Sequence, residues 1–307
     1  MKEMSSEHSH VSFDPKALET RVLHGLLLGG IAPRPIALAS TIDAQGRPNL
    51  APFSYFNVFS AAPPVVIFSP ARRGRDGSTK HTYENVKVVA EVVINLVDFD
   101  MVHACSLASS DFAEGVDEFK KSGLTPLPAD CVRPPRVAES PVSLECRVMR
   151  VEDLAEAPGA GSLVVCEVLR MHFRSDVMAT DASVDPWKLD LVGRCGGNAY
   201  VRASGEALFE VPKPLTVVGM GVDELPEDIR QSTVLTGADL AQLATFAECP
   251  DETEVNEHKL MELADLFMTH EGAGAALELA LHQQAQREIH NGDVNRAWKT
   301  LLAFNAG

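Results

Sequence analysis

The sequence predicts a mainly β, antiparallel domain followed by a helical extension. Short apolar runs rich in β-branched residues follow one another closely in the first two thirds of the chain, with hairpin turns and few helical segments between them. Parallel strands need a crossover connection, so this spacing favours an antiparallel barrel or sandwich. Composition then shifts near residue 210. Residues 211–307 hold 16 acidic and 6 basic residues of a chain with net charge −16, which predicts two domains, 1–210 and 211–307.

Each expected element rests on a local signal. Strands are expected where apolar, β-branched residues run between turn residues, and hairpin turns at residues 43–46 and 158–161. The predicted strands cover residues 35–41, 50–59, 64–68, 92–97, 142–154 and 162–173. Helices are predicted at residues 16–24, from a cap at Ser78 or Thr79 to about residue 87, and over residues 99–122.

The arm at residues 50–59 departs from the alternation of an ordinary strand. Pro48 and Pro52 precede a run of polar and aromatic side chains from Ser54 to Asn57. Proline cannot donate a hydrogen bond to a sheet, so a strand that contains it is an edge strand or leaves the sheet early.

The extension reads as helical. Helices are predicted at residues 239–247 and 255–266, and from 274 to 304 with a break at Asn291-Gly292. Two apolar stripes recur at helical spacing, which is typical of core or subunit contacts. They consist of Leu260, Leu263 and Phe267, and of Trp298, Leu301 and Leu302. The acidic residues of this part are expected on a solvated helical surface.

Composition excludes several classes of function. A net charge of −16 argues against nucleic-acid binding, which needs a basic surface. The sequence contains no run of about 18 apolar residues, so no membrane span is predicted. The polar N-terminus has no signal-peptide core, so a cytoplasmic location is expected. Six scattered cysteines contain no CxxC pair and no zinc-ligand spacing, so no metal site is predicted.

A group of hydrogen-bond donors is the strongest chemical signal. The sequence has no GxGxxG, P-loop, GxSxG or HExxH motif and no catalytic triad, so no catalytic side chain is predicted. Side chains suited to a ligand, all of them donors except Phe56, instead gather around three strands and one loop: Arg34, Ser40, Thr41, Ser54, Tyr55, Phe56, Asn57, Ser69, Arg72, Lys80 and Thr82. A cation and hydroxyls at a helix start suit a phosphate. The alternative is a solvated basic loop with ordinary helix caps.

The same region resembles a known family. The stretches "PRPIALASTIDAQGRPNLAPFSYFNVFSAAPPVVIFSP", "STKHTYENV" and "VVINLV" are similar to the flavin reductase-like, FMN-binding split-barrel family. The resemblance covers about residues 20–205, including "LVGRCGGNAYVR", and implies a Greek-key split barrel with flanking helices. His81 stands where the family commonly has Asp. The segment "GMGVDELPEDIRQSTVLTGADL" resembles a C-terminal extension of one subgroup.

The resemblance assigns roles to the donors. The FMN phosphate would be held by Lys80, Thr82 and Arg72, with Ser40 or Thr41 nearby. The flavin ring would lie along Ser54 to Asn57, where the prolines leave the backbone free to bond a ligand. Arg34, Ser69 and Asn95 complete the expected cofactor set. His172 and Arg194 would face the open side of the ring or the nicotinamide; the alternatives are a locally satisfied histidine and a surface salt bridge.

The activity implied is hydride transfer from NAD(P)H to flavin, which needs positioning and no side-chain acid, base or nucleophile. The family is usually a homodimer with flavin at the subunit interface, and a monooxygenase is a partner that such a reductase could supply. The alternative is an FMN-binding electron-transfer or non-catalytic protein of the same fold. Pyridoxal- and haem-related split barrels share the architecture, but the Ser-Thr and Lys-x-Thr pattern favours flavin.

Overall fold

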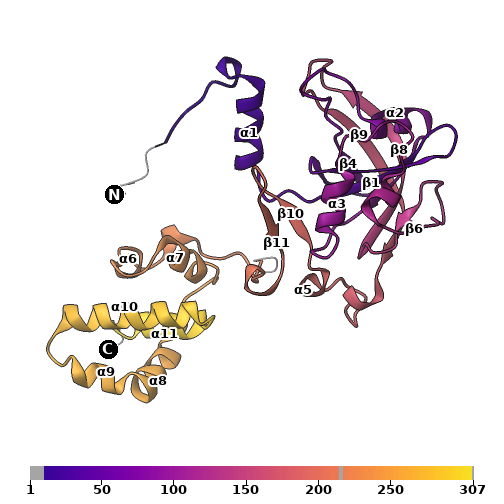
Figure 1. Ribbon diagram of the computed structural model, residues 1–307. Helices are drawn as coiled ribbons and strands as arrows, with labels where there is room; N and C mark the ends of the chain where they lie inside the picture. The colour runs from indigo at the N-terminus through magenta and orange to yellow at the C-terminus, as the bar shows by residue number, and fades with distance from the viewer. Residues whose placement is uncertain (1–9, 214–216, 306–307) are drawn as a thin grey trace. The chain divides into compact units, whose positions relative to one another are not determined.

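The computed structural model describes residues 10–213 and 217–305. The chain divides into two compact units, Met1–Phe209 and Glu210–Gly307 (Figure 1). The first unit is built on a seven-stranded sheet, and the second is helical.

Every neighbouring pair of strands in the large sheet is antiparallel, as the sequence predicted. The strand order is β2-β1-β5-β8-β9-β4-β3. The strands are β1 (Ala37–Ile42), β2 (Pro48–Phe53), β3 (Phe56–Ala61), β4 (Pro64–Phe68), β5 (Glu91–Asn95), β8 (Val142–Asp153) and β9 (Ser162–Phe173).

The predicted arm at residues 50–59 is in fact two strands. β2 pairs only with β1 and β3 only with β4, so consecutive strands form opposite edges of the sheet. The chain passes from one edge to the other at Ser54 and Tyr55, and the edges meet there without pairing, which makes the sheet a split barrel. Pro48 and Pro52 both lie on the edge strand β2, where a missing N–H leaves no interior hydrogen bond unmade.

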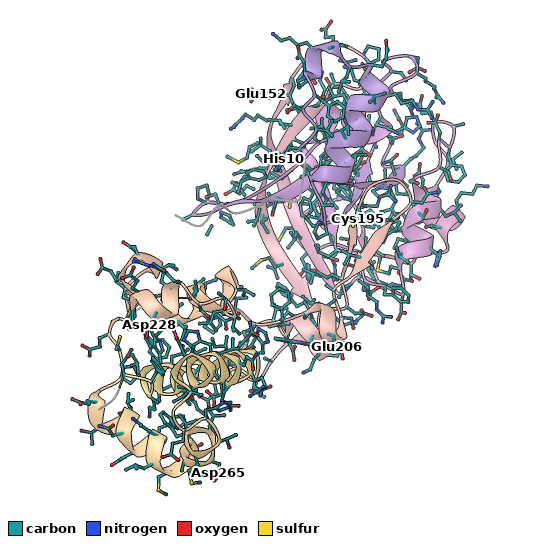
Figure 2. All side chains as sticks on the ribbon, turned by 90° about the vertical axis from the view of Figure 1, so that its left-hand side faces the viewer. His10, Glu152, Cys195, Glu206, Asp228 and Asp265 are labelled. Carbon is teal, nitrogen blue, oxygen red and sulfur yellow. The ribbon has the colours of Figure 1, made fainter. Side chains whose placement is uncertain are left out.

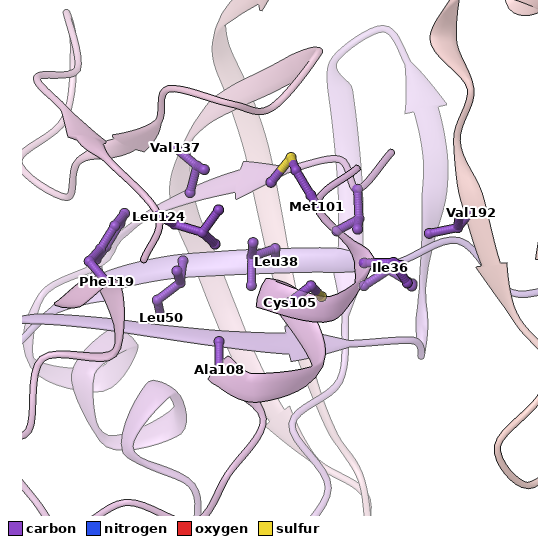
Figure 3. Packing of buried hydrophobic residues seen from close by; sticks show 12 residues of the cluster. Ile36, Leu38, Leu50, Met101, Cys105, Ala108, Phe119, Leu124, Val137 and Val192 are labelled. Carbon is purple, nitrogen blue, oxygen red and sulfur yellow. The ribbon is translucent and has the colours of Figure 1, made fainter. Parts of the chain in front are cut away.

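Alternation along the strands divides the interior into two cores. Leu38 and Leu50 face α3 (Val102–Ala108) and α4 (Glu118–Ser122), as Figure 3 shows, whereas Ala37 and Ala39 belong to the core on the other side. Burying each large side chain of this kind contributes about 1.5–3 kcal/mol.

Two helical predictions need correction. The predicted helix over residues 99–122 is two helices, because Gly115 takes a left-handed conformation (φ 80°) and Asp117 caps α4. Helix α2 (His81–Val88) has Lys80 at its N-cap and no side-chain cap, because the Thr79 hydroxyl bonds to Glu84 instead. The first turn of α2 therefore keeps free N–H groups.

The remaining elements of the first unit are short, apart from one N-terminal helix. They are η1 (Pro15–Ala17), α1 (Thr20–Gly30), β6 (Pro126–Leu127), β7 (Arg136–Val137), η2 (Ser175–Val177), α5 (Pro186–Leu189), β10 (Val192–Arg194), β11 (Tyr200–Arg202) and η3 (Gly205–Ala207). Strands β10 and β11 form a hairpin of their own.

The second unit packs around a buried tryptophan. Trp298 is fully buried, and its indole N–H donates to the carbonyl of Leu243 at 3.1 Å. The predicted break falls between α10 and α11, where Gly292 has φ 84°. Leu260, however, is exposed rather than part of a buried stripe. The elements are η4 (Val222–Glu224), α6 (Glu227–Arg230), α7 (Gly237–Leu243), α8 (Glu252–Glu262), α9 (Ala264–Thr269), α10 (Gly274–His290) and α11 (Val294–Leu302).

Acidic side chains such as Asp265 lie on the outside of this helical unit (Figure 2), as expected for a solvated surface. No helix in residues 10–213 and 217–305 combines the length and apolar character that crossing a membrane requires.

Candidate functional site

A cavity of about 230 Å³ lies where three parts of the first unit meet. Its walls come from the end of β2 with the Ser54–Tyr55 corner, from the segment joining β4 to α2, and from the loop after α3. The backbone N–H of Ser69, just after β4, donates to the carbonyl of Tyr55 at 2.8 Å and fixes the corner against that segment. We call this space the corner cavity.

The structure brings five of the predicted cofactor residues together in the corner cavity. They are Ser54, Tyr55, Ser69, Lys80 and Thr82. They come from three separate stretches of the chain, so the fold itself assembles this set.

Thr82 is buried in the first turn of α2, and its hydroxyl is oriented by a neighbour. The side-chain amide of Asn49 donates to Thr82 Oγ1 at 2.9 Å, and that of Asn85 donates to Thr41 Oγ1 at 3.0 Å. Because an amide N–H already occupies an acceptor position of Thr82, its hydroxyl proton remains free to point into the cavity. Thr41 belongs to the support of this hydroxyl and does not line the cavity.

Lys80 is the available cation of the site. Its ammonium has no hydrogen-bond or ion-pair partner among the residues that the structure describes, although the side chain is half-buried. Burial lowers the pKa of Lys80, and the positive charges of Arg73 and Arg75 lower it further, while the carboxylate of Asp111 opposes them in part. An anion placed beside this ammonium would relieve the repulsion.

Ser69 adds a buried polar atom without a partner. Its side chain is 8% exposed, and Ser69 Oγ makes no hydrogen bond within the described ranges. A buried hydroxyl left unpaired costs about 1–3 kcal/mol. Ser69 is a residue of the cavity wall, but its Oγ is covered and lies against Gly161, so its side chain must rotate to donate to a ligand in the cavity.

Arg73, not the predicted Arg72, lines the corner cavity. Its guanidinium donates to Asp111 and to the backbone of Thr79, and Arg75 bonds to the other oxygen of Asp111. Arg72 donates to the carbonyl of Gly77 at 3.3 Å, while its buried Nε has no partner in the described part of the chain. The sequence showed three arginines in one loop, but only the fold decides which of them faces inward.

Arg34 lies behind the cavity rather than in it. Its Nε donates to Ser54 Oγ at 3.4 Å, and its other nitrogens donate to the carbonyls of Leu28 and Ile31 at the end of α1 and of Cys195 at 3.2 Å. Arg34 therefore positions Ser54 by tying the corner to α1 and to the segment after β10.

Four further predicted residues do not line the cavity. Asn95 is fully buried and structural: its amide donates to the carbonyl of Leu38 at 3.0 Å and accepts from Val137 N–H and the Ser143 hydroxyl. Ser40 is fully buried, and its Oγ has no partner among the described residues. Phe56 packs against the core. Asn57 is exposed, and its side chain accepts a hydrogen bond from Val58 N–H.

His172 and Arg194 also lie away from the corner cavity. The His172 imidazole is 2.6 Å from Glu145, which is fully buried and accepts backbone N–H bonds from Asp130 and Cys131. The ligand atoms of Asp130, Glu145 and His172 all lie within 4.8 Å of one another. No spacing in the sequence indicated this group, because its members come from one loop and two strands. Both Glu145 oxygens already accept hydrogen bonds from the loop.

Other cavity residues were not among the predicted site residues. They include His24, Asn49, His81, Asp111, Phe112 and Glu118. Glu118 Oε2 accepts the backbone N–H of Leu50 at 3.0 Å, and burial raises the pKa of its carboxyl. Only the fold brings these residues of α1, β2, α2, the α3–α4 segment and α4 to one cavity.

Comparison with known proteins identifies the family. Residues 29–185 match the model of the flavin reductase like domain. The chain belongs to this flavin reductase-like family, as the resemblance implied.

Individual proteins are similar over about two thirds of the chain. An uncharacterized protein of Aquifex aeolicus is 33% identical over 201 residues, which is 66% of this chain and 100% of that protein. The structure of nitrilotriacetate monooxygenase component B from Bacillus cereus is similar with a TM-score of 0.62 and 28% identity, over 66% of this chain and 100% of that one. The structure of the 2-nitrobenzoate 2-nitroreductase of Pseudomonas fluorescens is similar with a TM-score of 0.58 and 26% identity, over 69% of this chain and 100% of that one.

Proposed function

We propose that this protein is a flavin reductase that binds FMN in the corner cavity and reduces it with NAD(P)H. One observation carries the proposal: in a chain of the flavin reductase-like family, Lys80 and Ser69 line one cavity, and among the described residues the Lys80 ammonium and the Ser69 hydroxyl have no partner. Both groups suit an anionic ligand that can accept hydrogen bonds.

The phosphate would lie at the start of α2. Lys80 supplies charge, Thr82 and Ser69 supply hydroxyl donors, and the uncapped first turn of the helix supplies N–H groups and the positive end of its dipole. The ring would lie against the Ser54–Tyr55 corner, which Arg34 and the Ser69 N–H hold in place.

A bound flavin would supply the redox chemistry, because it accepts a hydride. The chain's own residues bind, orient and exclude water, so the site needs no side-chain acid or base. The acceptor that we propose for the reduced flavin is a separate monooxygenase, and the similarity to a monooxygenase component B supports this partner.

We further propose a homodimer. Helix α1 buries none of its residues within the chain, and β3 exposes Val58 (66%) and Phe59 (63%). A second copy that covers these apolar side chains would remove them from water. Sedimentation equilibrium tests this directly: a monomer at micromolar concentration would exclude it.

The activity is tested by the absorption spectrum of the purified protein and by NADH and NADPH oxidation with added FMN. A flavin band and flavin-dependent oxidation of either nicotinamide are expected. A bound flavin without turnover would instead support an electron-transfer or non-catalytic protein, and no flavin binding at all would exclude both.

A further inference from the structure

A hollow of about 430 Å³ lies in the helical second unit, between α6 with the loop after it and the first half of α10 (Figure 1). We call it the acidic hollow. Its wall carries three carboxylates, Glu227 and Asp228 on α6 and Glu278 on α10, and no lysine or arginine of the described residues lines it. Its volume is in the range of about 300–1,000 Å³ that is typical of small-molecule sites.

The three carboxylates leave the negative charge of the hollow unbalanced. None of them lies within ion-pair distance of a cationic side chain in the described ranges. Glu227 and Asp228 accept hydrogen bonds from the amides of Gln231 and Asn305, at 2.8 and 2.9 Å. Because an amide is neutral, these bonds do not offset the charge. A cleft lined by charge of one sign attracts a ligand of the opposite sign, here a cation.

His282 presents a hydrogen-bond donor to the acidic hollow, although the residue is only 4% exposed. Its Nδ1 lies 2.7 Å from the Ser232 hydroxyl, which accepts the backbone N–H groups of Val234 and Leu235, both at 3.1 Å. A hydroxyl oxygen has two acceptor positions, so Ser232 donates its own proton to Nδ1 and the neutral imidazole carries its proton on Nε2. This Nε2 has no hydrogen-bond partner among the described residues.

The His282 imidazole is neutral at pH 7. Burial lowers its pKa from the ordinary value of 6.5, and the negative charges of Glu278 and Asp228 oppose this only in part. A buried N–H without a partner is unfavourable, so a ligand that fills the hollow should offer it an acceptor. The ligand therefore needs an uncharged oxygen as well as positive charge.

The spacing of the side chains favours an organic cation over a metal ion. A metal ion needs several ligand atoms that converge on one point. In residues 10–213 and 217–305, three such side chains bring their ligand atoms within 4.8 Å of one another only at Asp130, Glu145 and His172, in the first unit. The acidic hollow instead spreads its carboxylates over two helices, and Ala275 and Leu279 add apolar surface to its wall.

We propose that the acidic hollow binds a hydroxylated diamine, such as an aminocyclitol or a diamino sugar. One ammonium group lies at the carboxylates of α6 and the other at Glu278, while a hydroxyl oxygen accepts the Nε2 proton of His282. The apolar edge of the ring packs against Leu279. The hollow lies outside residues 29–185, which form the flavin reductase like domain, so this proposal does not depend on the proposed function.

Calorimetric titration of the full chain with three matched probes tests the proposal. 2-Deoxystreptamine carries ammonium and hydroxyl groups on one ring, cis-1,3-diaminocyclohexane keeps only the ammonium groups, and myo-inositol keeps only hydroxyls. The first probe should bind roughly tenfold more tightly than either of the others, because each of them lacks one half of the recognition.

Two variants separate the two halves. Glu278→Gln should weaken the binding of both diamines about tenfold. His282→Asn, whose amide replaces the Nδ1 side of the ring and lacks Nε2, should lower the affinity for 2-deoxystreptamine to that of the diamine without hydroxyls, whose own affinity should not change. Glu257→Gln is the matched control: it removes the same charge from an exposed position on α8, outside the hollow, and should bind like the wild type.

Thermal unfolding verifies that each variant is folded, and Glu278→Gln keeps the test decisive if His282→Asn does not fold. The proposal is overturned if 2-deoxystreptamine does not bind to the wild type, or binds no more tightly than cis-1,3-diaminocyclohexane. Equal losses in Glu257→Gln and Glu278→Gln would also overturn it, because they would show diffuse attraction to the acidic unit. Binding of Mg²⁺ alone that Glu278→Gln abolishes would replace the diamine site with a metal site. Each of these outcomes leaves the FMN titration of the corner cavity unaffected.

Discussion

The carboxylate of Asp111 accepts a hydrogen bond of 2.8 Å from Arg73 at the edge of the corner cavity. Its second oxygen accepts from Arg75 at 2.5 Å, and hydrogen bonds from these two arginines hold the pKa of Asp111 below its usual range. Asp111 therefore acts as an internal counter-ion at a place where we propose that a phosphate binds. A phosphate must share Arg73 with Asp111 or replace it.

Asp111→Asn should therefore tighten FMN binding. Removing one negative charge beside the phosphate frees Arg73 and Arg75, and a gain of about fivefold is expected at low salt, shrinking as salt rises. Fluorescence titration of FMN measures it. Glu114→Gln is the control, because Glu114 lies on the same loop and contacts only Arg47, at 3.6 Å. Weaker binding by Asp111→Asn would show that the carboxylate orders the arginines instead of competing with the ligand.

Ser69→Ala should have opposite effects on stability and on affinity. Without ligand, the variant loses an unpaired buried hydroxyl, so its free energy of unfolding should stay level or rise by about 1 kcal/mol. FMN affinity should fall, because a donor to the ligand is lost. Ser140→Ala is the matched control, since its hydroxyl donates to Leu96 at 2.8 Å and its loss should destabilise the fold. Urea unfolding together with an FMN titration separates the two effects, and an unchanged affinity would remove Ser69 from the site.

Asn95→Ala should destabilise the fold and leave the cofactor affinity of the folded protein unchanged. The side chain joins β1, β7 and β8 through three buried partners. Losing them should lower the free energy of unfolding by about 2–4 kcal/mol. Urea unfolding measures the loss. A stable variant with weakened FMN binding would instead place Asn95 in the site, as the sequence suggested.

Glu145→Gln should destabilise the protein in a pH-dependent way. Burial alone would raise the pKa of Glu145, but hydrogen bonds from Asp130, Cys131 and His172 outweigh it and the pKa lies below its ordinary value of 4.5. A depressed carboxyl pKa stabilises the fold at pH values above 4.5, and this stabilisation is lost as the pH falls through the folded-state value. The free energy of unfolding of the wild type should exceed that of the variant by about 2 kcal/mol at pH 7. This difference should shrink below pH 4.5.

Thermal unfolding across pH tests this, with the exposed Glu152→Gln as control. A gap that is constant down to acid pH would show that the Glu145 charge contributes nothing.

The sequence predicted the elements that carry their own signals. Strands β4 and β9 lie at the predicted residues 64–68 and 162–173, because β-branched runs there end at prolines, a turn or a loop. The order of strands, and with it the placement of β2 and β3 on opposite edges, depends on long-range pairing that a single sequence does not show.

The lining of the corner cavity could be predicted only where its residues lie close together in the sequence. Lys80 and Thr82, which line the corner cavity, could be predicted to lie together because a cation and a hydroxyl mark one helix start. Residue type did not reveal that the amide of Asn95 bonds to neighbouring backbone, so its place outside the lining of the corner cavity could not be predicted. Asp111 and Glu118 were missed because only tertiary packing brings the α3–α4 segment to the cavity.

The most direct test of the account compares FMN with riboflavin, which lacks the phosphate. Wild-type protein should bind FMN at least tenfold more tightly, because in the proposed placement Lys80 and Thr82 would contact the phosphate and not the ring. In Lys80→Ala/Thr82→Ala, FMN affinity should fall at least tenfold, to that of riboflavin, while riboflavin affinity stays constant. Equal binding of FMN and riboflavin by the wild type, or an unchanged FMN affinity in the double variant, would contradict the placement of the flavin phosphate at the start of α2.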